Sequence, residues 1–202
     1  RLREYPFQLS GGMKQRVMIA IALAGDPRLL IADEPTTALD VTIQAQVLEL
    51  LDSVQRARAT AILLITHDLG VVARIAHRVG VMYAGELIEI APREAFFGRA
   101  RHPYSEKLFA ALPGAIHRGA SLATIPGSVP ALSRRFDGCR FAERCHRAFE
   151  RCRLQAPEWH GVGEGHRVRC HLYSGDVDSI GAPAAPTGVV RSPDHGGNAG
   201  GL

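Results

Sequence analysis

Between residues 1 and 91 the spacing of hydrophobic positions switches repeatedly between helical and strand-like patterns. Gly12 to Ala24 carries apolar residues at helical spacing, whereas Leu29 to Ala32 is a short apolar run that predicts a buried parallel strand. Asp40 can cap a helix that runs from Val41 to about Ala57. Helices that alternate with strands in this way are typical of an α/β fold.

A second strand and a hairpin follow in the same stretch. Thr60 to Ile65 is another apolar run that predicts a buried strand. Val79 to Tyr83 and Glu86 to Ile90 flank Ala84-Gly85, and this arrangement predicts a β-hairpin. We therefore interpret residues 1–91 as one α/β unit.

The pattern changes after this unit. Residues 92–173 are richer in Arg, Pro and Cys, and their clearest element is a predicted helix from Tyr104 to Leu112 that stops at Pro113-Gly114. Regular spacing is lost between residues 119 and 135. Residues 174–202 contain seven Gly, three Pro and no aromatic residue, which predicts a disordered tail.

The composition fits a folded chain. Of the 202 residues, 46% are hydrophobic and 22% are charged, a balance that can bury a core. Apolar runs such as Val17 to Ala24 are too short to span a bilayer. No charged-then-apolar leader opens the chain, so secretion is not indicated. Residue 1 is Arg and not Met, which we expect of a sequence that begins inside a longer protein.

The net charge of +4 is unevenly distributed. Residues 1–91 contain 9 basic and 10 acidic residues, whereas residues 92–202 contain 15 basic and 10 acidic ones. A basic second half could attract an anionic surface. We prefer the simpler interpretation, a solvated Arg-rich face, and expect no nucleic acid partner.

The turn before the first predicted helix is a candidate anion site. Gly11 and Gly12 let the backbone approach a ligand closely, and Ser10 adds a hydroxyl group. The helix that follows directs its free N–H groups and its positive dipole end toward the same place. Taken alone, Ser10-Gly11-Gly12 is as well explained by an ordinary turn before a core helix.

Two strand ends carry polar side chains that suit nucleotide chemistry. Asp33-Glu34 follows the first predicted strand, where one carboxylate can hold a magnesium ion and its neighbour can polarise a water. His67 follows the second strand. Because parallel strands end at the same edge of a sheet, we expect His67 to lie near Glu34. Each feature alone also has a structural explanation.

Together these motifs resemble the ATP-binding subunits of ABC transporters. Leu9 to Gln15 matches the signature motif of that family, and Leu29 to Asp33 matches its Walker B strand. Glu34 stands in the position of the catalytic base, Ala38-Leu39-Asp40 matches the D-loop, and His67 matches the switch histidine. The resemblance implies the C-terminal part of an ABC-type P-loop ATPase domain, with a RecA-like parallel sheet and helices, followed by a small irregular extension.

The resemblance also assigns residue roles. It implies that Glu34 and His67 are catalytic and that Asp33 holds Mg²⁺ beside ATP. The residues expected to contact the nucleotide are Ser10, Gly11, Gly12, Gln15, Asp33 and Asp40.

Several segments narrow the resemblance to importers of oligopeptides and dipeptides. They are Tyr5-Pro6-Phe7-Gln8, Met18 to Leu23, His102 to Pro113, and Ile125 to Pro130. Nickel importers share much of this pattern, so an importer of nickel or another solute is an alternative. Two further alternatives are a soluble ABC ATPase that acts on nucleic acid and a metal-binding module attached to a decayed ATPase.

One expected motif is missing. The sequence contains no G-x-x-x-x-G-K-[ST], the loop that cradles phosphates, and no Q-loop glutamine. In the family both precede the signature motif, so we expect this chain to be the C-terminal part of a longer ATPase; a truncated gene would look the same. We therefore expect the chain alone neither to bind ATP tightly nor to hydrolyse it.

The resemblance implies a set of partners. A second ATPase subunit, identical or different, would complete each ATP site, because one subunit supplies Asp33, Glu34 and His67 and the other presents the signature turn. Two membrane permeases and an extracytoplasmic solute-binding protein would complete the importer. The implied location is the cytoplasmic face of the cell membrane, as a peripheral subunit.

Four cysteines cluster in the second half of the chain. They are Cys139, Cys145, Cys152 and Cys170. Four thiolates suit zinc or a [4Fe–4S] cluster, although the paired C-x₂-C pattern of zinc fingers is absent. The resemblance favours an iron–sulfur cluster with a structural role, and four reduced cysteines without metal are the alternative. Histidines nearby could replace a thiolate: His146, His166 and His171. Arginines between the cysteines predict lowered thiol pKa values.

Overall fold

A computed structural model describes residues 4–111, 125–131 and 133–175. The predicted helix stop at Pro113-Gly114 and most of the predicted disordered tail, residues 176–202, lie outside these ranges. Within the described part of the chain, no helix is both long and apolar enough to cross a membrane.

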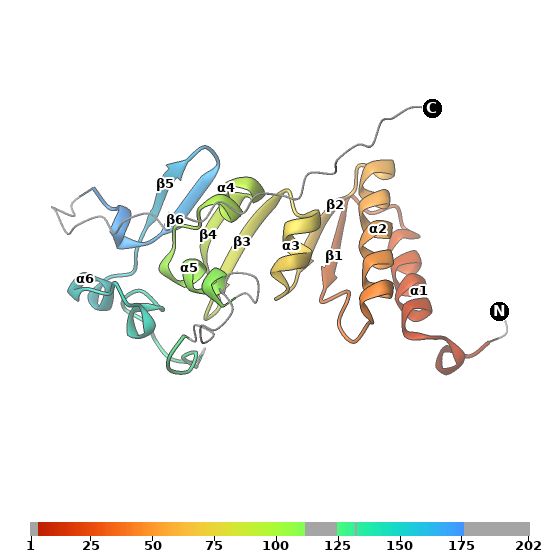
Figure 1. Ribbon diagram of the computed structural model, residues 1–202, viewed down its shortest axis with the longest axis horizontal. Coiled ribbons are helices and arrows are strands. Elements are labelled where there is room, and N and C mark those ends of the chain that lie inside the picture. Colours follow the sequence, from red (N-terminus) through yellow and green to blue (C-terminus); the bar gives the residue numbers. More distant parts are fainter. Residues whose placement is uncertain (1–3, 112–124, 132, 176–202) are drawn as a thin grey trace, which may run out of the picture.

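The N-terminal part contains three helices and a pair of parallel strands (Figure 1). A short 3₁₀ helix, Pro6–Gln8, precedes them. The elements are α1 (Gly11–Leu23), β1 (Leu29–Asp33), α2 (Val41–Arg58), β2 (Ala61–Ile65) and α3 (Leu69–Ile75). The strands pair in parallel, with Asp33 opposite Ile65 at their carboxyl ends. The predicted mixed α/β class with a parallel sheet is confirmed.

Both long helices begin at the predicted caps. The Ser10 side chain accepts a hydrogen bond from the Met13 backbone N–H, and the Asp40 side chain accepts one from Ile43 N–H at 2.9 Å. The two helices pack side by side (Figure 1). A Cβ at Gly12 would lie 2.5 Å from Cγ2 of Ile43. Glycine at position 12 is therefore required for the close approach of α1 to α2.

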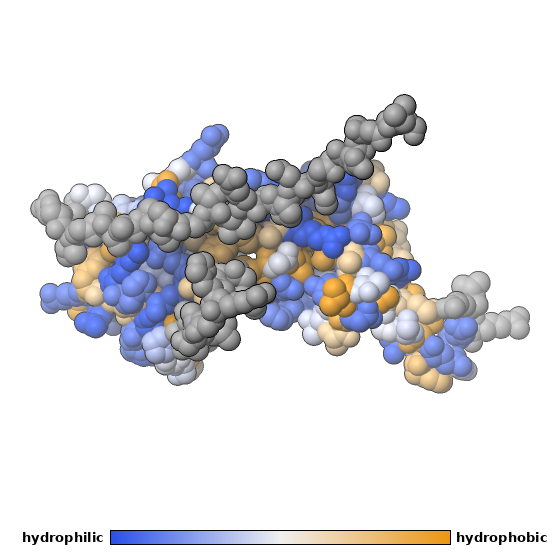
Figure 2. All heavy atoms as spheres, viewed as in Figure 1, coloured by the Kyte–Doolittle hydropathy of each residue, from blue (hydrophilic) through white to orange (hydrophobic). Residues whose placement is uncertain are grey.

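The prediction that both parallel strands are buried is wrong. Leu29 and Ile31 of β1 are 53% and 60% exposed, and Leu63 and Ile65 of β2 are 49% and 46% exposed. Leu30 is buried against the helices. The sheet has only two strands here, so one side-chain face of each strand has no covering layer within the described chain. In Figure 2, hydrophobic residues reach the surface among charged ones over this part of the molecule.

A second sheet joins two strands from residues 78–92 to two strands near the C-terminal end of the described chain. Its strands are β3 (Arg78–Tyr83), β4 (Glu86–Pro92), β5 (Trp159–Gly163) and β6 (His166–Arg169), in the antiparallel order β3-β4-β6-β5. The predicted hairpin is confirmed: Ala84 and Gly85 have φ values of 46° and 76°, as a tight hairpin turn requires. The strands β5 and β6 were not predicted by the sequence pattern.

Short helices and turns complete this part of the chain. They are α4 (Arg93–Gly98), α5 (Pro103–Ala110), the 3₁₀ turn Ala142–Arg144, α6 (Glu150–Leu154) and the 3₁₀ turn His171–Tyr173. The first of them, α4, packs against β3 and β4. The helix predicted from Tyr104 begins one residue earlier, because the side chain of His102 caps it. The core between the second sheet and these helices is aromatic. The Phe141 ring contacts those of Tyr83 and Tyr104, at centroid distances of 5.0 and 5.4 Å.

Candidate functional site

Glu34 and His67 are in direct contact at the carboxyl end of the parallel strands. Oε1 of Glu34 lies 2.7 Å from Nδ1 of His67 and accepts a second hydrogen bond from the His67 backbone N–H at 3.2 Å. The Glu34 backbone N–H donates to the carbonyl of Ile65, which extends the parallel pairing by one residue. The expected proximity of the two side chains is thus observed.

Two further polar groups fix this edge, and the sequence pattern had not singled them out. The Thr37 hydroxyl donates to Oε2 of Glu34 at 3.0 Å. Asp68 caps α3 by accepting from the N–H groups of Gly70 and Val71. Each is a short polar side chain beside a strand end or at a helix start, which is the signal that could have found them.

The contact between the two residues shifts both titrations. The hydrogen bond from His67 lowers the pKa of Glu34, and the hydrogen bond to Glu34 raises the pKa of His67. Glu34 is therefore held as a carboxylate, an acceptor that can orient a water molecule. The His67 side chain is 85% exposed, so it can reach a ligand in front of the strand ends.

The other expected ligand residues lie on the adjoining loops. Asp33 is the exposed last residue of β1, next to Glu34. The side chain of Asp40 caps α2, and that of Ser10 caps α1. Gln15 is half-buried on the first turns of α1. The arrangement gathers Asp33, Glu34 and His67 at one edge, where a divalent cation, a water and a phosphate could meet.

The turn before α1 is built as an anion site would be. Ser10 is exposed, and the N–H groups of Gly11 and Gly12 follow it at the helix start, whereas the Met13 N–H donates to the Ser10 side chain. The side chain nearest to the Cβ position of Gly11 is Leu39, at 3.5 Å. The turn thus lies beside the loop that carries Asp40. Glu34 is on a separate segment, directly after β1.

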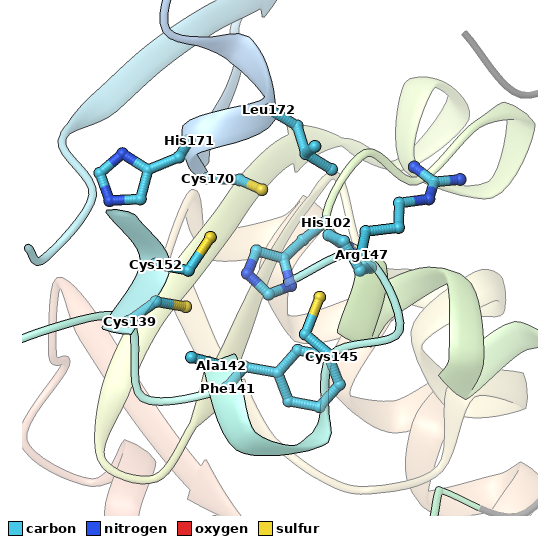
Figure 3. Close-up of a pocket in the computed structure, with 11 residues that line it drawn as sticks. His102, Cys139, Phe141, Ala142, Cys145, Arg147, Cys152, Cys170, His171 and Leu172 are labelled. Carbon is cyan, nitrogen blue, oxygen red and sulfur yellow. The ribbon is translucent and has the colours of Figure 1, made fainter. Parts of the chain in front are cut away.

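All four cysteines line one cavity in the C-terminal part. They reach it from separate segments, together with His102, Phe141 and Arg147 (Figure 3). All four are free thiols. The structure thus brings together residues that lie up to 31 positions apart in sequence, as the cluster hypothesis requires.

The expected lowering of the thiol pKa values is wrong. Burial raises the pKa of Cys139 to about 11 and that of Cys170 to about 12, and burial also raises the pKa of Cys145. The neighbouring arginines pair elsewhere: Arg144 donates to the carbonyls of Ile125 and Pro126. These thiols are therefore protonated at neutral pH, and a metal would have to displace their protons.

The cavity has suitable donor atoms for a metal centre, but their side chains are not arranged around a common metal position. The donor set of four converging thiols fits an iron–sulfur cluster or zinc. Among the residues that the structure describes, no three His, Cys, Asp or Glu side chains stand in a metal-holding arrangement. The histidines weighed as substitutes are engaged or exposed: His166 pairs with Glu89, His171 Nε2 pairs with the Gln155 carbonyl, and His146 is exposed.

A buried carboxylate lies in β4 of the second sheet, and sequence reasoning missed it. Glu89 is fully buried, and its carboxylate accepts hydrogen bonds from the backbone N–H groups of Arg101 and His102 at 2.7 and 3.0 Å. Its third partner is His166 Nε2 at 2.7 Å. The signal that could have found it is a glutamate among the apolar residues of the predicted strand Glu86 to Ile90. It ties β4, β6 and the start of α5 together.

Two family models match this sequence. The model for the C-terminal region of oligopeptide/dipeptide transporters matches residues 88–152, and the ABC transporter model matches residues 1–37. A solved bacterial ABC transporter cassette, MJ0796, aligns over 45% of this chain and 38% of that chain, with 37% identity and a TM-score of 0.41.

Curated relatives match most of this chain. The dipeptide transport ATP-binding protein DppD of Escherichia coli is 49% identical over 183 residues, 91% of this chain and 55% of the relative. The oligopeptide transport ATP-binding protein AppD of Bacillus subtilis is 52% identical over 172 residues, 85% of this chain and 52% of the relative. The chain thus spans about half the length of the curated relatives that it matches.

Proposed function

Because the chain is related in sequence to the ATP-binding proteins of oligopeptide and dipeptide ABC transporters, we propose that it is part of an ATPase subunit that energises peptide uptake. The two relatives named above are ATP-binding proteins of dipeptide and oligopeptide transport, so nickel import and action on nucleic acid are less favoured alternatives. The proposed location is the cytoplasmic face of the membrane. The proposed partners are a second ATPase subunit, two permeases and a solute-binding protein.

One contact carries the catalytic part of this proposal, the 2.7 Å hydrogen bond between Glu34 and His67. In the proposed site Asp33 holds the magnesium ion that accompanies ATP, and ionised Glu34 orients the attacking water. His67 stands where it can donate to the terminal phosphate. Its raised pKa favours a donor there, because a protonated ring carries two N–H groups.

The signature turn would act on a second nucleotide. Ser10 and Gly11 are exposed at the start of α1, so they can bind the phosphate of ATP held by the partner subunit. In this scheme each ATP molecule lies between two subunits, and its hydrolysis separates them. Gln15 and Asp40 would contribute from the same surface.

We further propose that Cys139, Cys145, Cys152 and Cys170 hold a structural metal centre, a [4Fe–4S] cluster before zinc. The support is their convergence on one cavity in a part of the chain built from short elements. When bound, such a centre supplies folding free energy. The chain's own contribution is to bury Cys152 and Cys170, to half-bury Cys139 and Cys145, and to direct all four into one cavity.

The ATPase proposal is tested with Glu34→Gln in the complete subunit assembled with its partners. Turnover should fall by about 10²–10⁴-fold while ATP binding persists, because the amide cannot accept a proton. Glu49→Gln, an exposed glutamate on α2 that pairs with Arg74, is the matched control and should hydrolyse ATP normally. Equal rates in the two variants would reject the role of Glu34.

The metal proposal is tested by anaerobic purification followed by iron, sulfide and zinc analysis. Wild type should carry a stoichiometric centre, and replacing all four cysteines by serine should remove it. His77→Gln changes an exposed histidine that does not line the cavity and should leave the metal content unchanged. Folded wild-type protein without iron or zinc would reject the centre.

A further inference from the structure

His102 presents an unpaired N–H group at the cysteine cavity. Its Nδ1 accepts a hydrogen bond from the Tyr104 backbone N–H at 3.0 Å, so the neutral ring carries its proton on Nε2. Within the described chain Nε2 is buried without a hydrogen-bond partner, and the residue is 1% exposed. Burial lowers the pKa of His102 to about 4, so the ring stays neutral at physiological pH.

The ring cannot turn to find another partner. The backbone N–H of His102 is bonded to Glu89, while its Nδ1 is bonded to the next turn of the chain. The ring packs against Phe141, with a centroid distance of 5.8 Å. Main chain, ring nitrogen and ring face are therefore all fixed, and the orientation of Nε2–H follows from them.

The cavity that His102 lines also contains the four cysteines (Figure 3). Buried N–H donors in folded proteins nearly always have an acceptor, so an unpaired one needs an explanation. Arg147, the cationic side chain at this cavity, can only donate. Cysteine sulfurs become good acceptors when a metal removes their protons, and so do the sulfides of a cluster.

We propose that His102 donates a hydrogen bond from Nε2 to the sulfur atoms of a metal centre in this cavity and is a positioning residue, not a ligand. The inference rests on the cysteine centre proposed above. A donor to the sulfurs withdraws electron density from them. It therefore slows metal release and, for an iron–sulfur cluster, raises the reduction potential.

The test compares two variants of the complete subunit, loaded anaerobically with iron and sulfide or with zinc. His102→Phe keeps a ring against Phe141 but removes the donor, whereas His102→Gln keeps an N–H donor. We expect His102→Phe to bind metal about 10–100-fold more weakly, as loss of such a partner does at other metal sites, and to release it faster to a chelator. Its cluster should also have a more negative potential, and His102→Gln should restore both properties. His77→Phe, at an exposed position that does not line the cavity, is the control.

The possible outcomes separate the two proposals. Wild type without metal rejects the centre itself. A metal-loaded wild type whose release rate and potential equal those of His102→Phe overturns only the donor role. Loss of all metal in both His102 variants, with the fold intact, would make the ring a ligand and also overturns it.

A measurement without mutation covers the case in which His102→Phe does not fold. In zinc-loaded wild type labelled with ¹⁵N-histidine, the Nε2 proton of His102 should exchange slowly with solvent. Rapid exchange of that proton in the loaded protein would overturn the hydrogen bond.

Discussion

The backbone N–H of Cys139 donates a 2.8 Å hydrogen bond to the carbonyl of Cys152. This bond holds two of the four cavity cysteines on adjacent main-chain segments. It requires glycine at position 138, because a Cβ there would overlap the Cys152 carbonyl oxygen and lie 2.6 Å from the Arg153 carbonyl. Main-chain proximity, and not side-chain choice alone, thus sets the spacing of this pair.

Gly138→Ala should open the cavity. The new methyl group forces the two segments apart, because the atoms it meets belong to the backbone and cannot rotate away. We expect a loss of about 1–3 kcal/mol in unfolding free energy and faster metal release, measured by urea denaturation and chelator competition. Gly161→Ala is the control, since its Cβ would meet no atom within 4 Å. Equal stability of the two variants would contradict the steric requirement.

Glu89→Gln should destabilise the C-terminal part. The carboxylate accepts three hydrogen bonds, and the amide nitrogen of glutamine can accept none, so at least one buried donor loses its partner. The expected cost is about 1–3 kcal/mol by denaturant titration. Glu158→Gln, an exposed change in the same part of the chain, should be neutral. A neutral result for Glu89→Gln would mean that the network adds nothing to stability.

The stability that the Glu34–His67 pair contributes should be lost both when the pH is raised and when it is lowered. The raised pKa of His67 adds stability below its ordinary value of 6.5, and this contribution is lost as pH rises through the raised value. The lowered pKa of Glu34 adds stability above 4.5, lost as pH falls through the lowered value. NMR titration should give a pKa for His67 above its ordinary value of 6.5. Glu34→Gln should lower the His67 pKa while Glu49→Gln does not, and an unchanged His67 titration in Glu34→Gln would refute the coupling.

Residues 1–202 alone should not bind ATP with micromolar affinity. The sequence contains no G-x-x-x-x-G-K-[ST] loop, whose N–H groups and lysine would provide most of the phosphate contacts. Calorimetry with magnesium and ATP should show no saturable binding, which excludes an affinity of about −8 kcal/mol. A version extended by an in-frame loop of that kind is the positive control. Micromolar binding by a monodisperse sample of residues 1–202 would reveal a phosphate site built from other residues.

The elements that the sequence predicted correctly are those defined by local signals. The cap at Asp40 and the helical spacing behind it gave the start of α2, and Ala84-Gly85 gave the hairpin. The strands β5 and β6 were missed because they are short, and β6 is held by pairing with β4 across a long loop, with Glu89 opposite Val168. That pairing has no local signature.

In the candidate sites too, features set by a general rule could be predicted from sequence, and features set by tertiary packing could not. Glu34 and His67 could be paired from sequence because parallel strands end at one edge, and the edge geometry is a general rule. The thiol pKa values could not be inferred, because arginines adjacent in sequence need not face the sulfurs. Arg144 donates to main-chain carbonyls, and Arg140 lies over the ring of Phe136. Burial, which depends on the tertiary fold, decides the direction of the shift.

The close approach of Gly12 to Ile43 has a mechanical consequence. Gly12 is the second residue of α1, and Ile43 lies in the first turn of α2, so the two helices touch where both begin. A tightly packed contact of this kind transmits displacement instead of absorbing it. We therefore expect a displacement of the Ser10 turn to be passed on to the Asp40 loop, and the reverse, through this contact.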